Sequence, residues 1–411
     1  SGMSFRTVFL AVFAGTALIV AALIVNARRP AVERLQPSPE LIRASGRCAE
    51  CHRRETPAVV AEFERSGHAR GGVSCLDCHT PAKGQAGIEH RGFTIAGGLS
   101  SANCRACHAR QYEEYVRSRH AAPAWAAVRG AQDFTDSAIA FAEQYHPGAV
   151  RRPPNAIAVL EGASARASGC LACHDVGRPN PDGSIGTCTD CHARHLASVA
   201  LARQPETCGQ CHMGPDHSQI EIYDESKHGV LYRLQWPTMR LDAAPERLTT
   251  TDMPVPTCAT CHLSGLNGGA TTHDVGQRLS WWLFADVSEH RPDWQRSRNA
   301  MAAVCLNCHT RPTVDSVYAQ ADAVVATTNT KVREAEALVA GLRQRHLITP
   351  QPFDEPIEFA VFDLWHYYGR TAKHGAFMGG PDFVQWHGNY QLLLKTAELR
   401  DMAAALEHGR R

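Results

Sequence analysis

Every cysteine of this 411-residue chain belongs to a Cys-x-x-Cys-His pentapeptide, and the 16 cysteines make eight such motifs. This spacing lets two thioether bonds hold the vinyl edge of one porphyrin while the adjacent histidine reaches the iron as proximal ligand. Zinc knuckles and thioredoxin-like sites do not require a histidine after every second cysteine. The repeat therefore predicts eight covalently bound c-type haems. The motifs are Cys48–Cys51–His52, Cys75–Cys78–His79, Cys104–Cys107–His108, Cys170–Cys173–His174, Cys188–Cys191–His192, Cys208–Cys211–His212, Cys258–Cys261–His262 and Cys305–Cys308–His309.

Covalent haem attachment also predicts the compartment. In bacteria these thioether bonds form outside the cytoplasmic membrane, so we expect the chain to be exported to the periplasmic side. Residues 7–27 carry no charge and residues 8–25 are almost wholly apolar, close to the roughly 20 residues that span a bilayer. We expect residues 1–29 to be a retained N-terminal membrane anchor, with a cleaved signal segment as the alternative.

The charge balance excludes one class of partner. The chain has 42 basic and 41 acidic residues, which gives no basic surface for a nucleic acid. Each haem would add two propionates, so the loaded protein should be more acidic than its sequence. With so many porphyrins in one chain, haem faces should form much of the core, and we expect the protein without haem not to fold.

The spacing of the motifs predicts the domain organisation. The motifs end at His309, so we expect an octahaem-binding domain over residues 30–312 and a helical C-terminal domain over residues 313–411. No segment shows a convincing alternating β pattern. The predicted fold class is mostly α: a multihaem cytochrome c with irregular haem-binding segments and a helical C-terminal domain.

The C-terminal domain has a clear helical pattern. Residues 313–345 have Ala, Val, Leu, Glu and Arg in amphipathic order, which predicts one long helix. Pro350, Pro352 and Pro356 should interrupt the helical pattern. Further helices are expected over 359–368 and 390–407, and polar helices of this length often serve oligomer contacts, with a solvated face as the simpler interpretation.

The remaining histidines determine which irons can bind a substrate. A haem with two histidine ligands transfers electrons, whereas one with an open position can bind a substrate. Of 22 histidines, eight lie in the motifs, and seven others have contexts suited to distal ligation, which would leave one haem five-coordinate. The seven are His68, His90, His120, His195, His228, His273 and His290. Five more histidines are available for the same role: His146, His346, His366, His374 and His387.

Several local strings are similar to those of a known family. They are Cys-His-Ala-Arg-His at 191–195, Cys-His-Met-Gly-Pro-Asp-His at 211–217, Glu-Ile-Tyr-Asp-Glu-Ser-Lys-His-Gly at 221–229, Thr-Thr-His-Asp-Val-Gly at 271–276 and Gly-Pro-Asp-Phe-Val-Gln-Trp-His-Gly at 380–388. With the order of the eight motifs, they make the chain resemble the octahaem hydroxylamine oxidoreductases (HAO), which include hydrazine-oxidising enzymes. The resemblance implies that the haem on Cys170, Cys173 and His174 is catalytic. It also implies a distal pair at Asp216 and His217 and a homotrimer in which haems of neighbouring subunits connect.

The implied role of the distal pair is chemically reasonable. Reactions of small nitrogen compounds move protons together with electrons. A histidine titrates near neutral pH and can deliver a proton, and a neighbouring aspartate can orient it. The alternative is that Asp216 only caps a helix and His217 ligates a haem iron.

One residue departs from the family pattern. Oxidising members have a tyrosine in the C-terminal string that is cross-linked to the catalytic porphyrin of a neighbouring subunit, whereas this chain has Phe383. Phenylalanine lacks the phenol oxygen for that bond, and family members without the tyrosine resemble reductases. Three nearby tyrosines, Tyr367, Tyr368 and Tyr390, are possible replacements.

The resemblance and this departure together predict a periplasmic enzyme that reduces nitrite or hydroxylamine, or both, to ammonium at a five-coordinate haem. The alternatives are a hydroxylamine or hydrazine oxidoreductase, and a non-catalytic wire with eight six-coordinate haems. Reduction of sulfur oxyanions is a smaller possibility. A membrane quinol-linked or cytochrome c partner is expected to exchange the electrons.

Overall fold

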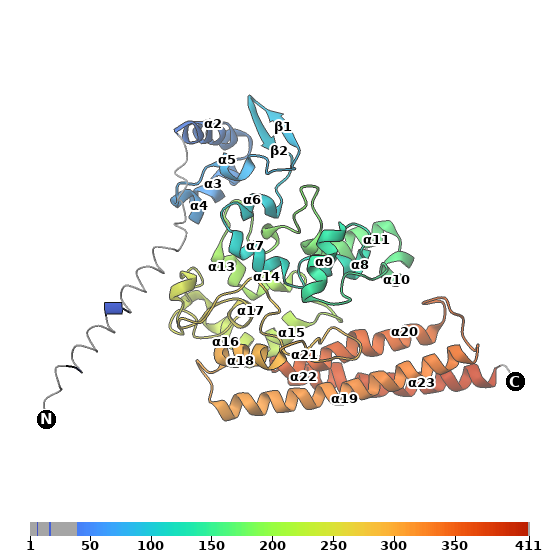
Figure 1. The fold of residues 1–411 in the computed structure, drawn as a ribbon. Helices are drawn as coiled ribbons and strands as arrows, with labels where there is room; N and C mark the ends of the chain where they lie inside the picture. Colours follow the sequence, from blue (N-terminus) through green and yellow to red (C-terminus); the bar gives the residue numbers. More distant parts are fainter. Residues whose placement is uncertain (1–5, 7–15, 18–38, 410–411) are drawn as a thin grey trace.

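The computed structural model describes residues 39–409, together with residues 6, 16 and 17. The predicted anchor at residues 1–29 therefore lies almost entirely outside the described residues. Among the residues that are described, no helix combines the length and the apolar character needed to cross a bilayer. Helices are the main secondary structure of the described chain and are connected by long loops, as the sequence predicts (Figure 1).

The N-terminal module consists of four helices and the small hairpin at the top of Figure 1. Helix α5 shows why a haem-attachment motif folds locally as a helix. The Ser74 side chain accepts a hydrogen bond from the backbone of Asp77, and the Asp77 side chain accepts one from the backbone of Ser74, which is a capping box. The helices are α2 (Pro39–Glu55), α3 (Pro57–Arg65), α4 (Gly67–Arg70) and α5 (Cys75–His79).

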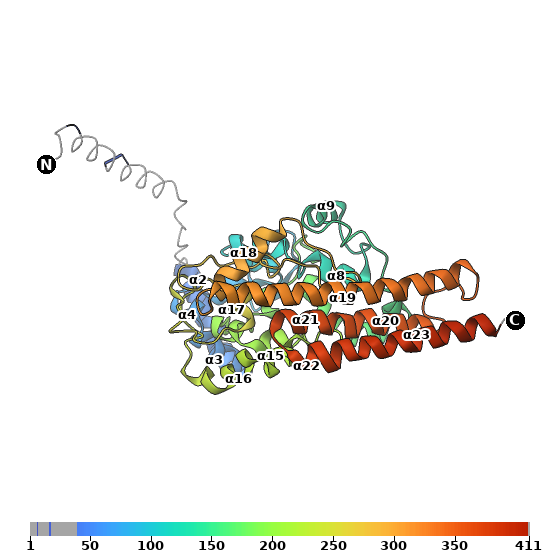
Figure 2. The same cartoon turned by 90° about the horizontal axis from the view of Figure 1, so that it is seen from below.

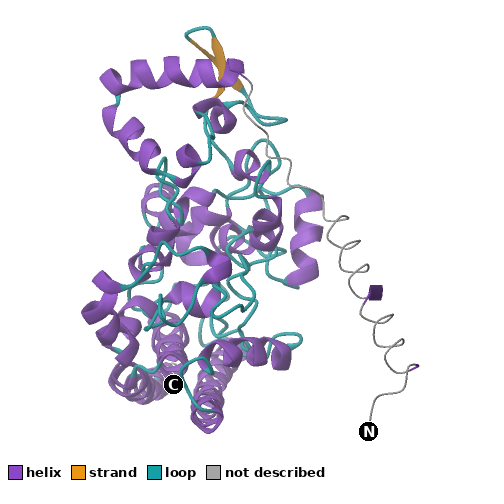
Figure 3. Ribbon diagram, turned by 90° about the vertical axis from the view of Figure 1, so that its left-hand side faces the viewer, coloured by secondary structure: helices purple, strands orange, loops and turns teal. Residues whose placement is uncertain are grey.

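The hairpin was not expected from the sequence. Strand β1 (Gly87–His90) pairs antiparallel with β2 (Phe93–Ala96), so the expectation of no strands was wrong at this point (orange in Figure 3). The two connecting residues, Arg91 and Gly92, have φ angles of 52° and 89°, as a type I′ turn requires. The strands have four residues each and β1 is exposed throughout, so neither is long enough to display a buried alternation.

Short helices and loops make up the haem-binding middle of the chain. Three of the eight attachment motifs coincide with a short helix: α5 in the N-terminal module, and α12 (Cys170–His174) and α17 (Cys258–His262) in the middle of the chain. A helical turn places residues three and four apart on one face, so both cysteines and the histidine can reach the same porphyrin. The other helices of this region are α6 (Ser101–Arg105), α7 (Ala109–Val116), α8 (Ala122–Arg129), α9 (Asp136–Tyr145), α10 (Ala156–Leu160), α11 (Ala163–Ser168), α13 (Val199–Arg203), α14 (Pro205–Gly209), α15 (Gln219–Glu225), α16 (Lys227–Gln235) and α18 (Trp294–Cys305).

The C-terminal region forms a bundle of long helices that lie side by side in two views (Figures 1 and 2). Helix α19 (Arg311–Gln344) is the predicted long helix, and Pro356 occupies the first turn of the next helix, where a missing N–H costs nothing. The remaining segments are α20 (Pro356–Phe362), the π-helical turn η5 (Asp363–Gly369), α21 (Arg370–Met378), α22 (Pro381–Val384), the π-helical turn η6 (Gln385–Asn389) and α23 (Tyr390–His408).

The bundle has its own apolar core. Val332, Leu342, Ile357, Leu364 and Leu392 are buried in one cluster contributed by α19, α20, η5 and α23. Burying such side chains is worth roughly 1.5–3 kcal/mol each, so the bundle gives a rigid support. Helix α21 lies between this core and the haem-binding part of the chain, where it contacts α15.

Candidate active site

One continuous cavity of about 3700 Å³ runs through the described haem-binding region, and the histidines of all eight motifs line it. The orientation of two proximal histidines fits iron ligation. The Nδ1 atom of His174 lies 2.6 Å from the carbonyl oxygen of Ala124, and that of His262 lies 3.1 Å from the carbonyl oxygen of Val275. A carbonyl can only accept, so each Nδ1 carries the proton and each Nε2 is left as a metal ligand.

Six motif histidines lie opposite a second histidine in the cavity. An imidazole nitrogen binds a metal at about 2 Å and its ring centroid lies roughly 1 Å further away, so two axial imidazoles on one iron should have centroids about 6 Å apart. The observed centroid separations run from 5.8 to 6.5 Å. The pairs are His52 with His90, His79 with His195, His108 with His68, His192 with His273, His212 with His120 and His309 with His228. The structure thus brings six of the seven predicted distal histidines to a spacing that fits an iron between two imidazoles.

The seventh predicted distal histidine, His290, lies elsewhere. Its ring is stacked between Trp281 and Trp294, with centroid distances of 3.6 and 4.0 Å. Among the described residues, no histidine ring faces His262 at the spacing of the six pairs. His290 does not line the cavity, although its Nδ1 atom lies 3.2 Å from the carbonyl oxygen of Ser280 and leaves Nε2 as a possible ligand. Ligation by His290 therefore stays a prediction.

Neighbouring motifs are in contact through their cysteines. The thiols of Cys104 and Cys188, of Cys208 and Cys258, and of Cys173 and Cys211 lie close enough to shift the pKa of a partner. Three further pairs interact electrostatically: Cys48 with Cys75, Cys78 with Cys104, and Cys261 with Cys305. Haems attached at these positions would lie edge to edge, and the structure therefore supports a continuous electron path through the protein.

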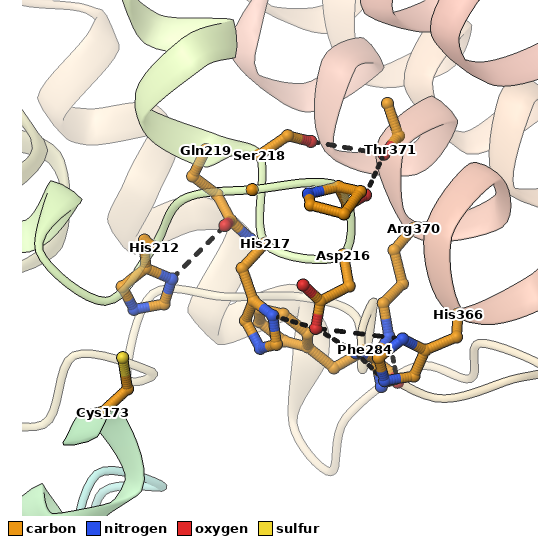
Figure 4. Close-up of polar contacts among 12 residues, drawn as sticks. Cys173, His212, Asp216, His217, Ser218, Gln219, Phe284, His366, Arg370 and Thr371 are labelled. Atoms are coloured by element: carbon orange, nitrogen blue, oxygen red, sulfur yellow. Dashed lines mark hydrogen bonds and ion pairs between the residues drawn. The ribbon is translucent and has the colours of Figure 1, made fainter. Parts of the chain in front are cut away.

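The predicted catalytic pair lies near two motif histidines, because the His217 ring centroid is 6.4 Å from that of His174 and 6.3 Å from that of His212. The ring planes of His217 and His174 make an angle of 85°. The Nδ1 atom of His217 contacts Oδ2 of Asp216 at hydrogen-bond distance (Figure 4). Asp216 does not cap the following helix, because α15 begins at Gln219 with Ser218 at its N-cap. The capping alternative is therefore wrong, and Asp216 instead orients His217.

Two cationic or polar side chains hold the Asp216 carboxylate from the other side. Oδ2 of Asp216 lies 3.8 Å from Nδ1 of His366 and 4.0 Å from Nη1 of Arg370. Arg370 Nη1 donates to Nε2 of His366 at 2.9 Å, so the proton of His366 resides on Nδ1 and faces the carboxylate.

These contacts determine the charges of the cluster. Burial by itself raises the pKa of Asp216, but the His217 hydrogen bond, followed by His366 and Arg370, brings the pKa below its usual value. Burial and then Arg370 lower the pKa of His366 to about 3. Asp216 is therefore a carboxylate at neutral pH and His366 is neutral. A fixed carboxylate keeps the Nδ1 proton of His217 in place and directs its Nε2 away.

Helix α21 positions both chain segments that surround His217. Thr371 donates to the carbonyl oxygen of Pro215 at 3.1 Å, which holds the loop that carries the catalytic pair. Arg370 donates twice to the carbonyl oxygen of Phe284, at 3.0 and 2.8 Å, and the Phe284 ring lies 5.1 Å from that of His217. Lys373 is fully buried and donates to the carbonyl oxygen of Ala285 at 2.9 Å.

The family-specific aromatic position is occupied by a buried side chain. Phe383 is only 8% exposed and stacks on His387 with a centroid distance of 5.0 Å. Of the three alternative tyrosines, Tyr367 lines the cavity, 5.4 Å from His366, whereas Tyr390 is 47% exposed beside Trp386. Burial raises the pKa of Tyr367, so its phenol is protonated.

Sequence reasoning missed most of this supporting cluster. His366 was identified only as an available histidine, and Arg370, Lys373 and Phe284 were not identified at all. One signal was present: the string Arg-Thr-Ala-Lys-His at 370–374 is polar around the helix, yet all five residues are buried. A helix that is polar on every face either is solvated or serves a polar site.

Comparison with known proteins is consistent with this architecture. The family described as seven times multi-haem cytochrome CxxCH matches residues 71–356, a range that contains seven of the eight motifs and excludes the one at Cys48. A probable nitrite reductase-hydroxylamine oxidoreductase fusion protein of Kuenenia stuttgartiensis is 30% identical over 397 residues. That match covers 80% of this chain and 41% of the fusion protein, so the chain spans less than half of that relative.

Two solved structures share the fold. A hypothetical multihaem protein superposes with a TM-score of 0.77 at 22% identity and covers 92% of this chain and 97% of its own. The reducing HAO-like protein complex of Kuenenia stuttgartiensis gives a TM-score of 0.67 at 21% identity, covering 89% of this chain and 86% of that one. The chain therefore belongs to the seven-times multihaem CxxCH cytochromes, carries c-type haems, and has a fold similar to that of the reducing HAO-like protein complex.

Proposed function

We propose that this protein is a periplasmic octahaem cytochrome c that reduces nitrite, hydroxylamine or both to ammonium at the haem on Cys170, Cys173 and His174. The observation that carries the proposal is the Asp216–His217 pair near His174, held by His366 and Arg370. The printed names of the similar fusion protein and of the reducing HAO-like complex support this substrate class and this direction.

The reaction requires protons as well as electrons. Reducing nitrite to ammonium consumes six electrons and eight protons and releases two waters, and reducing hydroxylamine consumes two electrons and three protons and releases one water. Cys170, Cys173 and His174 would hold the haem, which would supply the iron and the electrons for this reduction. The protein supplies the protons: His217 holds one at a site that faces His174, and the Asp216 carboxylate stabilises the protonated ring.

Phe383 supports the reductive direction. The residue has no phenol oxygen, and its ring is occupied by stacking on His387 within its own subunit. A cross-link of the kind found in the oxidising enzymes would need another residue, and Tyr367 is the tyrosine at the cavity wall next to His366. Oxidation of hydroxylamine or hydrazine through such a bond is the alternative activity.

The spacing at His174 also favours a second candidate. A centroid separation of 6.4 Å lies within the range of the six paired histidines, so His217 is close enough to ligate the iron itself. With a six-coordinate haem at every motif, the protein would be a wire and would bind no substrate.

We also propose the surroundings in which the enzyme works. Electrons would come from a membrane quinol-linked or cytochrome c partner, with the N-terminal segment keeping the protein at the membrane. A homotrimer is supported by apolar side chains that the C-terminal bundle exposes, among them Trp386 and Leu393, which are 57% and 60% exposed.

The absorption spectrum of the fully reduced protein, before and after substrate addition, separates these functions. The reductase predicts an ordinary c-type spectrum with one high-spin haem and reoxidation by nitrite or hydroxylamine. A distinct band from a modified haem would favour the oxidase. Absence of both the high-spin haem and the reoxidation would contradict catalysis and leave the wire.

A further inference from the structure

Three arginines that take no part in the cluster around Asp216 line the same cavity near Trp282: Arg119, Arg152 and Arg291. We propose that they form an anion-binding site on the cavity wall, whose ligand is a carboxylate or a small oxyanion. This inference rests partly on the proposed function, since nitrite is one of the anions the site would take.

The site is built around a single aromatic ring. The Cζ atom of Arg119 lies 4.0 Å from the centroid of Trp282, and the Cζ atom of Arg291 lies 4.4 Å from it. Both distances correspond to guanidinium groups stacked on the ring. The indole is itself held in place, because the backbone N–H of Trp282 donates to the carbonyl oxygen of Glu289.

These three arginines form no ion pair with the described residues, although the charge of Asp274 acts on Arg291 from a greater distance. No carboxylate oxygen of the described residues lies within 4.0 Å of these three guanidinium groups, whereas Arg298 nearby in sequence forms two hydrogen bonds with Asp322. The Nε atom of Arg291 is buried without a hydrogen-bond partner. Burial, followed by repulsion from Arg291 and Arg152, lowers the pKa of Arg119 to about 10.

This crowding of like charges is explained by an anion. Bringing unpaired cations together away from water is unfavourable unless a counter-charge joins them. The planar guanidinium groups match the two oxygens of a carboxylate or of nitrite. Each haem carries two propionate carboxylates, so the anion can be part of the cofactor, or it can be a free oxyanion on its way to the iron.

The position of Arg152 connects this site with the catalytic pair. Its charge acts on Arg119 and also on Arg370, which contacts Asp216. Positively charged side chains thus line the cavity both beside Trp282 and beside Asp216. Such a lining concentrates anions and leaves neutral molecules unaffected.

The test uses the haem-loaded R119Q and R291Q variants, with R119K as the variant that keeps the charge. Arg178 provides a matched control: it lies over Trp125 and near Asp175, outside the cavity, so R178Q removes an equivalent charge elsewhere. Haem content, the midpoint potential of each resolvable haem and the KM values for nitrite and for hydroxylamine, which is uncharged at neutral pH, are measured for each variant.

Two results would support the site and identify its ligand. A rise of about tenfold in the KM for nitrite, typical of losing a hydrogen bond to a charged group, with an unchanged KM for hydroxylamine and recovery in R119K, assigns a free oxyanion. A lower midpoint potential of one haem with unchanged KM values assigns a propionate. The oxidised haem carries one more positive charge than the reduced haem, so removing a nearby cation stabilises the oxidised form and lowers the potential.

The proposal is overturned if R119Q and R291Q match R178Q in the potentials and in both KM values. Failure of the proposed function is a separate outcome. If the unmodified protein does not reduce nitrite, the potentials still decide whether the arginines bind a propionate, and equal potentials in all variants then reject the site.

Discussion

Replacing Asp216 by asparagine should remove the charge that orients His217 and leave the shape of the side chain unchanged. The carboxylate is 25% exposed, contacts His217 through Oδ2, and faces His366 and Arg370 at 3.8 and 4.0 Å. An asparagine amide can present its NH₂ group to His217, which would then accept through Nδ1. The proton would move to Nε2, and the ring would lose the counter-charge that stabilises its protonated form.

The size of the effect follows from the hydrogen bond that is lost. A hydrogen bond to a charged group contributes about 1.5–3 kcal/mol. Because a quarter of this carboxylate is exposed, solvent screens it and the lower part of that range applies. About 1.5–2 kcal/mol corresponds to a decrease of roughly ten- to thirtyfold in rate, since each 1.36 kcal/mol is tenfold. We expect kcat to fall by this factor with both nitrite and hydroxylamine, because both need protons.

The assay is steady-state reduction of each substrate by the reduced, haem-loaded D216N variant, with haem content measured in parallel. Asp133 offers a matched control, because it is 28% exposed and accepts hydrogen bonds from Arg129 and Trp125 outside the cavity. D133N should lose comparable stability and keep full activity. A D216N enzyme within threefold of the unmodified kcat for both substrates would refute the role assigned to Asp216.

Three further predictions concern haem number, pH and buried charge. Intact mass spectrometry should find eight haems rather than seven, and replacing Cys48 and Cys51 by serine should remove one of them. A mass that corresponds to seven haems in the unmodified protein would reject attachment at the Cys48–Cys51–His52 motif. The contribution of His366 to the free energy of unfolding should be complete above about pH 6.5, the ordinary pKa of histidine, and should fall toward pH 3. Its pKa is lowered to about 3 in the folded protein, so acid favours the unfolded chain, where the histidine is protonated more easily. H366Q should flatten this pH dependence, and an unchanged unfolding profile would contradict it. K373M should destabilise the protein by about 2–4 kcal/mol, because buried acceptors lose their donor. Thermal unfolding followed by haem circular dichroism measures this loss. K395M, which removes a partly exposed surface ion pair, should cost less than about 1 kcal/mol, and equal losses in the two variants would argue against the role of Lys373.

The sequence was sufficient for everything that depends on short-range spacing. The motifs specify where haem is attached, and amphipathic order together with Pro356 gave the long helix α19 and the start of α20. Six histidines that lie opposite a motif histidine could be identified from their neighbours along the chain, such as Ser-Lys before His228, and their ligation of iron stays a prediction.

Contacts between distant segments could not be obtained in this way. Arg370 reaches Phe284 across more than eighty positions of sequence, and this contact depends on how α21 is packed. The placement of His290 between two tryptophans is local, but stacking on Trp281 and Trp294 depends on an isolated backbone bridge that periodicity does not reveal. The hairpin at β1 and β2 was missed for a different reason, since four-residue exposed strands leave no pattern.

The contact between Cys173 and Cys211 has a consequence for how current flows through the molecule. Electrostatic interactions between cysteines run from Cys48 through Cys104, Cys188 and Cys208 to Cys305, and among the described residues the His174 motif takes part in them at Cys211. A haem on the His174 motif would then lie on a side branch of the electron path rather than on its main line. Electron transfer between the two ends of the protein would continue when an inhibitor blocks that branch. A substrate bound at the branch could receive electrons stored on all the other haems.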